Sequence, residues 1–169
     1  MKGTALILAG GGGKGAYEIG VWKAMKELGI DKKIQAVSGA SVGGLNGALF
    51  VQGDYDRAER IWLTLTAEKI LPPGNINLME ELKAFAEKGP IMDIESMIKE
   101  GMFSRDGLIQ IIRQELNVNK IADRQIPCYL ACYNVTENMM DYINLTGMKP
   151  NDMETILLAT SALPGIFGP

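Results

Sequence analysis

The chain has 169 residues, 47% of them apolar and 22% charged, so it is long enough to bury a substantial core as one domain. A formal net charge of -3, without any stripe of Lys and Arg, argues against nucleic acid as a partner. Histidine is absent, which excludes an internal Ser-His-Asp triad, a histidine general base and a histidine metal ligand. No apolar run reaches the roughly 20 residues that a membrane span requires, so we expect a soluble, cytoplasmic protein.

Short apolar runs alternate with helical patterns at the start of the chain. Thr4–Ala9 is typical of a strand, and Gly10–Gly13 ends it. Helical spacing follows over Ala16–Leu28, with Gly29 as its C-cap and with an apolar stripe of Ile19, Val21, Trp22, Met25 and Leu28. Ile34–Ser38 predicts a second strand, and a helix is predicted from Gly43 to about Gln52. This order predicts a parallel sheet with helices packed against it.

The remaining pattern is mainly helical until a second strand-rich segment begins. We predict helices over Tyr55–Leu65, Leu78–Lys88, Ile94–Lys99, Asp106–Leu116 and Met153–Ala162, a strand over Ile126–Val135, and its hairpin partner over Met139–Leu145. Cys128 and Cys132 lie about 13 Å apart on that strand, whereas a disulfide needs less than about 7 Å between Cα atoms. We therefore expect two free, buried cysteines and no metal site.

Gly39-Ala40-Ser41-Val42-Gly43 matches the pattern G-x-S-x-G between a predicted strand and a predicted helix. A serine on such a tight turn presents its hydroxyl outward, and the residues two positions to either side must be small. The start of the helix favours negative charge, and the Val42 amide is placed to bind an oxyanion. Ser41 is therefore the candidate nucleophile. The alternative is a glycine-rich turn with an incidental serine.

Two further glycines follow this motif inside the predicted helix, at Gly44 and Gly47. Each costs a helix roughly 1 kcal/mol relative to alanine. Their presence favours a helix that lies very close to the sheet or to its neighbour.

A second glycine motif, Gly10-Gly11-Gly12-Gly13-Lys14-Gly15, follows the first predicted strand and opens the first predicted helix. Consecutive glycines allow several backbone amides to converge on an anion, which in an acyl hydrolase is the oxyanion of the tetrahedral intermediate. The string also fits G-x-G-x-x-G, so nucleotide binding is the alternative. Against it, the second strand ends in Val37-Ser38 without an acidic residue, and Gly15 stands where a Walker A loop has Ser or Thr.

Together with the tail Ala159-Thr160-Ser161-Ala162-Leu163-Pro164-Gly165, these two motifs resemble the patatin-like phospholipases. The resemblance covers nearly the whole chain and implies a three-layer α/β/α fold with a mainly parallel central sheet. It also implies hydrolysis of fatty-acyl esters of glycerolipids and phospholipids by a Ser-Asp dyad, without a metal or organic cofactor. By this resemblance Ser41 is the nucleophile, Gly10–Gly13 supply oxyanion amides, and Lys14 occupies the family's basic position.

The family's aspartate follows the Leu-Pro-Gly segment in an Asp-Gly-Gly or Asp-Gly-Ala motif. We therefore expect residues 1–169 to be the N-terminal part of a patatin-like domain, with the catalytic aspartate beyond Pro169. The one Asp-Gly pair, Asp106-Gly107, is explained by helix initiation after Ser104, and Asp106 as the base is the alternative.

Two kinds of partner follow from these expectations. As an enzyme, the chain takes a lipid or ester substrate and makes at most peripheral contact with a membrane. The second hypothesis is an inactive fragment or a binding module, which self-associates through an incomplete sheet edge.

Overall fold

The computed structural model describes residues 3–66, 69 and 106–162, and the chain divides into two compact units. The first unit comprises residues 1–64 and 112–161 and contains all the strands of the described chain. Of the second unit, residues 65–111 and 162–169, the structure describes residues 65, 66, 69, 106–111 and 162. The helices predicted over Leu78–Lys88 and Ile94–Lys99 lie outside the described residues.

Strands and helices alternate at the start of the chain, as the sequence predicts. In chain order the elements are β1 (Thr4–Leu8), α1 (Gly15–Glu27), β2 (Ile34–Ala40), α2 (Val42–Gln52), α3 (Tyr55–Thr64), α7 (Asp106–Glu115), α8 (Val118–Ala122), β3 (Cys128–Asn134), β4 (Met139–Asn144) and α9 (Pro150–Thr160). Short 3-10 turns, η1 (Gly12–Lys14) and η2 (Asp31–Lys33), precede α1 and β2 respectively.

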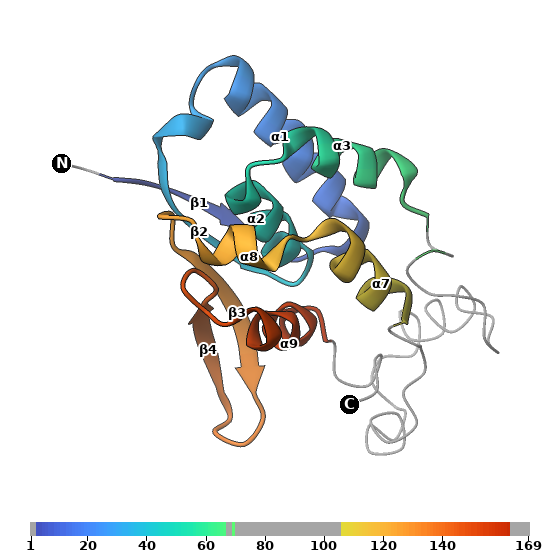
Figure 1. Ribbon diagram of the computed structural model, residues 1–169, viewed down its shortest axis with the longest axis vertical. Helices are drawn as coiled ribbons and strands as arrows, with labels where there is room; N and C mark the ends of the chain where they lie inside the picture. The colour runs from blue at the N-terminus through green and yellow to red at the C-terminus, as the bar shows by residue number, and fades with distance from the viewer. Residues whose placement is uncertain (1–2, 67–68, 70–105, 163–169) are drawn as a thin grey trace, which may run out of the picture. The chain divides into compact units, whose positions relative to one another are not determined.

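The described strands form one sheet in the order β1-β2-β3-β4 (Figure 1). β1, β2 and β3 are parallel, and β4 pairs antiparallel with β3 as its hairpin partner. The predicted α/β class with a mainly parallel sheet is confirmed. Leu8 lies opposite Gly39, and Ala40 lies opposite Ala131. The segments that follow β1 and β2 therefore leave the sheet side by side, at the carboxyl ends of these strands.

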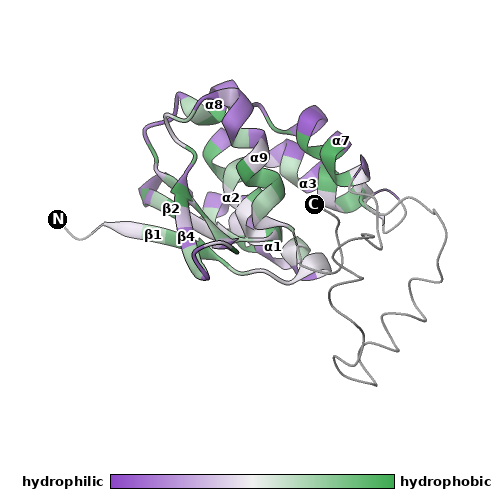
Figure 2. Ribbon diagram, turned by 90° about the horizontal axis from the view of Figure 1, so that it is seen from below, coloured by the Kyte–Doolittle hydropathy of each residue, from purple (hydrophilic) through white to green (hydrophobic). Residues whose placement is uncertain are grey.

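Helices of the first unit cover one face of this sheet, and Figure 2 shows α2, α8 and α9 on the same side of the strands. Leu8, Val37 and Leu130 are buried on this face, each within reach of a glycine of α2. The residues between them along each strand point to the opposite face, because successive side chains of a strand alternate between the two faces of the sheet. Ile7 and Tyr142 on that opposite face are 78% and 65% exposed.

Glycines allow α2 to lie directly on the sheet. A Cβ atom added to Gly47 would lie 3.0 Å from Cγ1 of Val37, and one added to Gly44 would lie 3.2 Å from Cγ of Leu130. These are tighter than ordinary van der Waals contacts, so a larger side chain would push the helix away from the strands. The predicted close approach of this helix is confirmed.

Cys128 and Cys132 are free and buried, which confirms the prediction from their spacing. Burial raises the pKa of the Cys128 thiol to about 12. Burial is also the main cause that raises the pKa of Cys132, and the nearby carboxylate of Asp141 adds to it. Both thiols are therefore protonated packing groups near neutral pH.

Three local predictions need correction. Leu28, expected in the apolar stripe of α1, is 71% exposed because it lies beyond the last residue of α1, while Gly29 adopts the left-handed conformation expected of a C-cap. α9 begins at Pro150 rather than Met153, since proline fits the first helical turn. The short helix α8 was not predicted; it begins after Asn117, whose side chain accepts a hydrogen bond from the Lys120 amide.

Candidate active site

Ser41 lies on the sharp turn between β2 and α2. Its backbone has φ 53° and ψ -129°, close to about +60° and -120°, the values of a position in type II′ turns that is usually glycine. A non-glycine residue in this region costs of order 1–3 kcal/mol and persists only where its surroundings hold it. The side chain is partly exposed at the end of the sheet. The turn therefore presents a hydroxyl on a strained, fixed backbone.

Gly43, two residues after Ser41, brings the start of α2 against β1. A Cβ atom at Gly43 would lie 2.5 Å from the carbonyl oxygen of Leu8, a separation that real side chains essentially never show. The turn of Ser41 and the end of β1 are thus in direct backbone contact. Glycine is the one residue that fits there.

The glycine motif that follows β1 lies beside Ser41. A Cβ atom at Gly10 would be 3.4 Å from Cβ of Ser41. Gly12 has φ 56°, a conformation that favours glycine, and the space where Gly12 and Gly13 would carry side chains is open. The stem of Lys14 lies against Gly11. This part of the chain therefore presents exposed backbone close to the candidate nucleophile.

Two helical segments begin close to Ser41. Val42 is the first residue of α2 and Gly12 the first of the 3-10 turn η1, and the first amides of a helix have no acceptor within the helix. Backbone amides at such positions attract anions, because their N–H groups and the helix dipole act together. The two motifs that the sequence singles out thus lie side by side.

The end of the glycine motif is fixed by contacts from α2 and α3. A Cβ atom at Gly15 would lie 2.6 Å from Cζ2 of Trp62 and 2.7 Å from Cγ2 of Val42. Asn46 of α2 donates to the Gly15 carbonyl at 3.0 Å and to Oε2 of Glu18 at 2.8 Å. Its carbonyl oxygen accepts from Nε1 of Trp62 at 2.8 Å. Asn46 is 2% exposed, so a buried amide joins α1, α2 and α3.

Thr160, the last residue of α9, contacts the other motif. Its hydroxyl accepts a hydrogen bond from the Ser41 amide at 3.1 Å and donates one to the Ala131 carbonyl at 2.8 Å. The sequence analysis assigned no role to Asn46 or to this hydroxyl. One signal was present, since Asn46 interrupts a helix of small and apolar residues, and a polar side chain in such a helix needs a buried partner.

The predicted dyad also requires an acid or base close to the Ser41 hydroxyl. In the part of the chain that the structure describes, no carboxylate hydrogen bonds to the Ser41 hydroxyl. Asp106 opens α7 as an acid of its first turn, which agrees with the helix-initiation interpretation. Ser104 and the Leu163-Pro164-Gly165 segment lie outside the described residues.

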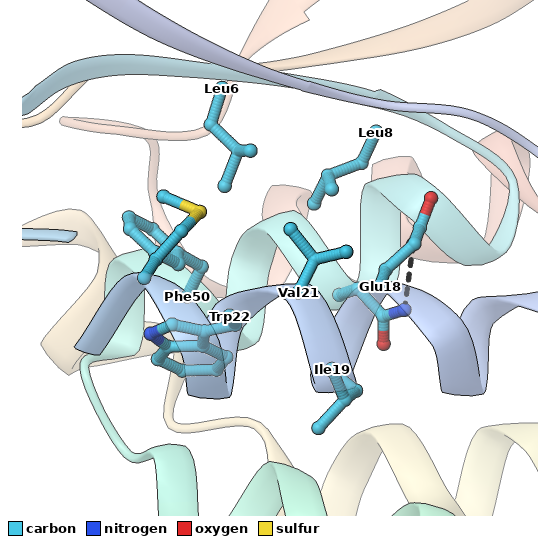
Figure 3. Close-up of a pocket in the computed structure, with 9 residues that line it drawn as sticks. Leu6, Leu8, Glu18, Ile19, Val21, Trp22 and Phe50 are labelled. Atoms are coloured by element: carbon cyan, nitrogen blue, oxygen red, sulfur yellow. Dashed lines mark hydrogen bonds between the residues drawn. The ribbon is translucent and has the colours of Figure 1, made fainter. Parts of the chain in front are cut away.

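A crevice between β1 and α1 is too small for a lipid substrate. Figure 3 shows it between β1, which contributes Leu6 and Leu8, and α1, with Glu18 and Phe50 at its sides. The space open to a solvent molecule is about 10 Å³, about what one water requires. An acyl chain does not fit in this packing gap.

Within residues 3–66, 69 and 106–162, no helix combines the length and the apolar composition that crossing a bilayer requires.

The chain is similar to known proteins over part of their length. It is 27% identical over 136 residues to the patatin-like phospholipase domain-containing protein 7 of Mus musculus, covering 80% of this chain and 9% of that protein. It is 41% identical over 51 residues to the lysophospholipase nte1 of Aspergillus terreus, which is 30% of this chain and 3% of the relative. The chain thus spans a small part of these relatives.

Solved structures share the fold at lower identity. The structure of VipD from Legionella pneumophila matches 99% of this chain and 43% of its own, with a TM-score of 0.60 and 16% identity. The type III effector protein ExoU matches 96% of this chain and 40% of its own, with a TM-score of 0.52 and 17% identity. The family model described as patatin-like phospholipase matches residues 6–169. The chain therefore belongs to the patatin-like phospholipase family.

Proposed function

We propose that this protein is a serine lipid acyl hydrolase in which Ser41 is the nucleophile. The observation that carries the proposal is the position of Ser41, on a strained strand-to-helix turn next to the glycine motif. In the proposed reaction Oγ of Ser41 attacks the carbonyl carbon of a fatty-acyl ester. The alcohol leaves with a proton, and water then releases the fatty acid from the acyl-serine.

Backbone amides stabilise the oxyanion in this proposal. The Val42 amide and those of Gly10–Gly13 are assigned this role, and the support for it is the Gly10–Ser41 contact and the open space around Gly12 and Gly13. Lys14 adds positive charge on the same loop. The ribose-binding acid of a dinucleotide fold has no counterpart at the end of β2, where Ser41 stands instead, so nucleotide binding is the weaker alternative.

We assign the role of general base to an aspartate, in line with the family resemblance and with the absence of histidine from the sequence. Without a base, a serine hydroxyl is a weak nucleophile. Asp106 remains the alternative candidate, although its place in the first turn of α7 favours a role in the helix.

A glycerophospholipid or lysophospholipid is the proposed substrate, since curated relatives carry the names lysophospholipase and patatin-like phospholipase. Such a substrate involves peripheral contact with a lipid surface, and we propose a cytoplasmic location. We also propose self-association through β1, which is one of the two edge strands of the described sheet and in which Ile7 is 78% exposed. Sedimentation of the Ile7→Lys variant tests this, because a shift toward monomer is expected and an unchanged oligomer contradicts it.

Release of fatty acid from mixed micelles of phosphatidylcholine or lysophosphatidylcholine tests the proposed activity. Ser41→Ala is expected to lower kcat at least about 10³-fold, as removal of a nucleophile does. Ser38→Ala, three residues earlier on β2, is the matched control and should keep the activity. Undiminished release by Ser41→Ala would show that Ser41 is not the nucleophile. If the wild type releases no fatty acid from either lipid, the result supports the alternative hypothesis of a binding module.

A further inference from the structure

The hydroxyl of Thr160 connects the Ser41 turn to the neighbouring strand. It lies 3.1 Å from the Ser41 amide nitrogen and 2.8 Å from the Ala131 carbonyl oxygen. A hydroxyl has one proton to donate, and the amide also must donate. The direction of both hydrogen bonds is therefore fixed: Ser41 N–H donates to Thr160, and Thr160 O–H donates to Ala131.

Ser41 needs such a restraint, because its backbone conformation is unfavourable for a residue with a side chain. Before Ser41, Ala40 is held in the sheet opposite Ala131. After it, the Ser41 carbonyl accepts from the amides of Gly44 and Leu45 at 2.9 and 3.2 Å. The Ser41 N–H is the other backbone polar group of this residue, and it donates to the Thr160 hydroxyl. Rotation of that peptide would move Cβ and the reacting Oγ.

The packing around Thr160 is independent evidence that this side chain is built into the turn. A Cβ atom at Gly44 would lie 3.2 Å from Cγ2 and 3.3 Å from Oγ1 of Thr160. Both Thr160 and its neighbour Ser161 are 8% exposed. The Ser161 hydroxyl, however, donates within α9, to the carbonyls of Leu157 and Leu158 at 3.2 and 3.0 Å. Two adjacent buried hydroxyls thus have different partners, and only that of Thr160 contacts the Ser41 turn.

We propose that Thr160 is a positioning residue for catalysis, which holds the nucleophile Ser41 in its strained conformation through the Ser41 amide. The inference rests on the proposed function, in which Ser41 attacks the ester. Thr160 contacts neither the substrate nor the reacting atoms. Its effect falls on the geometry of attack, and so on kcat rather than on KM.

Four variants of the full-length protein separate these roles, with p-nitrophenyl butyrate as the probe. Thr160→Val keeps the shape and removes the hydroxyl, so we expect kcat to fall about 10- to 100-fold, as for a small misplacement of a reacting group, with KM unchanged. Thr160→Ser restores the hydroxyl and should return kcat to within about threefold of wild type. Ser161→Ala should match wild type.

Two results would overturn the proposal: a wild-type kcat for Thr160→Val, or an equal loss in Thr160→Ser, which would show that the hydroxyl at this position does not sustain the activity. Ser41→Ala separates this inference from the proposed function, because hydrolysis that survives in Ser41→Ala refutes the nucleophile itself. Should Thr160→Val not fold, amide hydrogen exchange of the wild type decides. Slow exchange at Ser41 supports the hydrogen bond to a buried hydroxyl, and exchange as fast as in a free peptide overturns it.

Discussion

Gly39 lies directly against the backbone of Gly43. A Cβ atom on Gly39 would lie 2.3 Å from the Gly43 carbonyl oxygen and 2.5 Å from its carbonyl carbon. A Cβ atom on Gly43 would likewise lie 2.5 Å from the carbonyl oxygen of Leu8 in β1. The first glycine of the G-x-S-x-G motif thus lets the helix return close to its own strand. The second lets the same helix start against the neighbouring strand. Both contacts are to backbone atoms, which cannot move aside as a flexible side chain can.

We predict that Gly39→Ala and Gly43→Ala each destabilise the fold by about 1–3 kcal/mol or more, since a methyl group there overpacks against backbone. Gly20 is the matched control, because it lies in α1 with open space where its Cβ would be. Gly20→Ala should stabilise by about 0.5–1 kcal/mol through helix propensity. Urea unfolding measures all three, and equal midpoints for the Gly39 and Gly20 variants would refute the packing argument.

Asn46 is predicted to hold the end of the glycine motif against α2. Removing its side chain leaves the Trp62 indole N–H without its hydrogen-bond acceptor, and the Gly15 carbonyl loses the hydrogen bond from Asn46. Asn46→Ala should therefore lower the free energy of unfolding by about 1–3 kcal/mol. Trp62→Phe, which removes the indole N–H and keeps an aromatic ring, should cost less. A wild-type unfolding midpoint for Asn46→Ala would show that the network does not contribute.

A second substitution at Asn46 gives a pH-dependent test. Asn46→Asp places a carboxylate beside Oε2 of Glu18, which Asn46 contacts at 2.8 Å in the wild type. Like charges raise the folded-state pKa of such a pair above its unfolded value. Stability is then retained below the unfolded pKa and lost as the pH rises through the folded one. The variant should be less destabilised near pH 4 than at pH 7 in urea titrations, and a constant difference would contradict this.

The buried thiols predict a loss of stability at alkaline pH. The pKa of Cys128 is raised by burial to about 12, against about 8.5 in an unfolded chain. Between these values the unfolded state loses a proton that the folded state keeps, so stability is intact below about pH 8.5 and falls by up to about 1.4 kcal/mol per pH unit above it. Cys132 contributes with the same sign.

Urea unfolding from pH 7 to 10 measures this slope, and the double variant Cys128→Ala, Cys132→Ala should flatten it. Burial and the Glu59 hydrogen bond raise the pKa of Tyr55 to about 12. Tyr55 therefore adds to the slope of stability against pH only above the ordinary tyrosine pKa of about 10. An equal slope in wild type and double variant between pH 8.5 and 10 would exclude the thiols as its source.

Local patterns predicted the elements that carry the site. Short apolar runs predicted β1 and β2, and helical patterns predicted α1 and α2. The glycine turns between them predicted where each strand ends, all within a few dozen residues. The parallel pairing of β1 with β2 follows from the helix between them, because a crossover returns the chain to the same edge. The position of the two glycine motifs side by side was therefore predictable.

Contacts between distant residues were not predictable in the same way. Thr160 binds the Ser41 amide across 119 positions of sequence, and no local pattern tells which hydroxyl of the Thr160-Ser161 pair faces the turn. Leu28 is exposed because α1 ends at Glu27, one residue earlier than the helical stripe predicts. The short helix α8 has five residues, too few for a clear helical period.

Labelling with a fluorophosphonate, mapped by mass spectrometry on the full-length protein, tests the central claim most directly. The reagent phosphonylates a serine that is already activated, so its product reports the nucleophile and its base together. We predict one adduct, on Ser41, that is absent from Ser41→Ala and present at the wild-type level in Ser38→Ala. A folded wild-type protein that hydrolyses lipid esters but carries its adduct on another residue would contradict the assignment of Ser41.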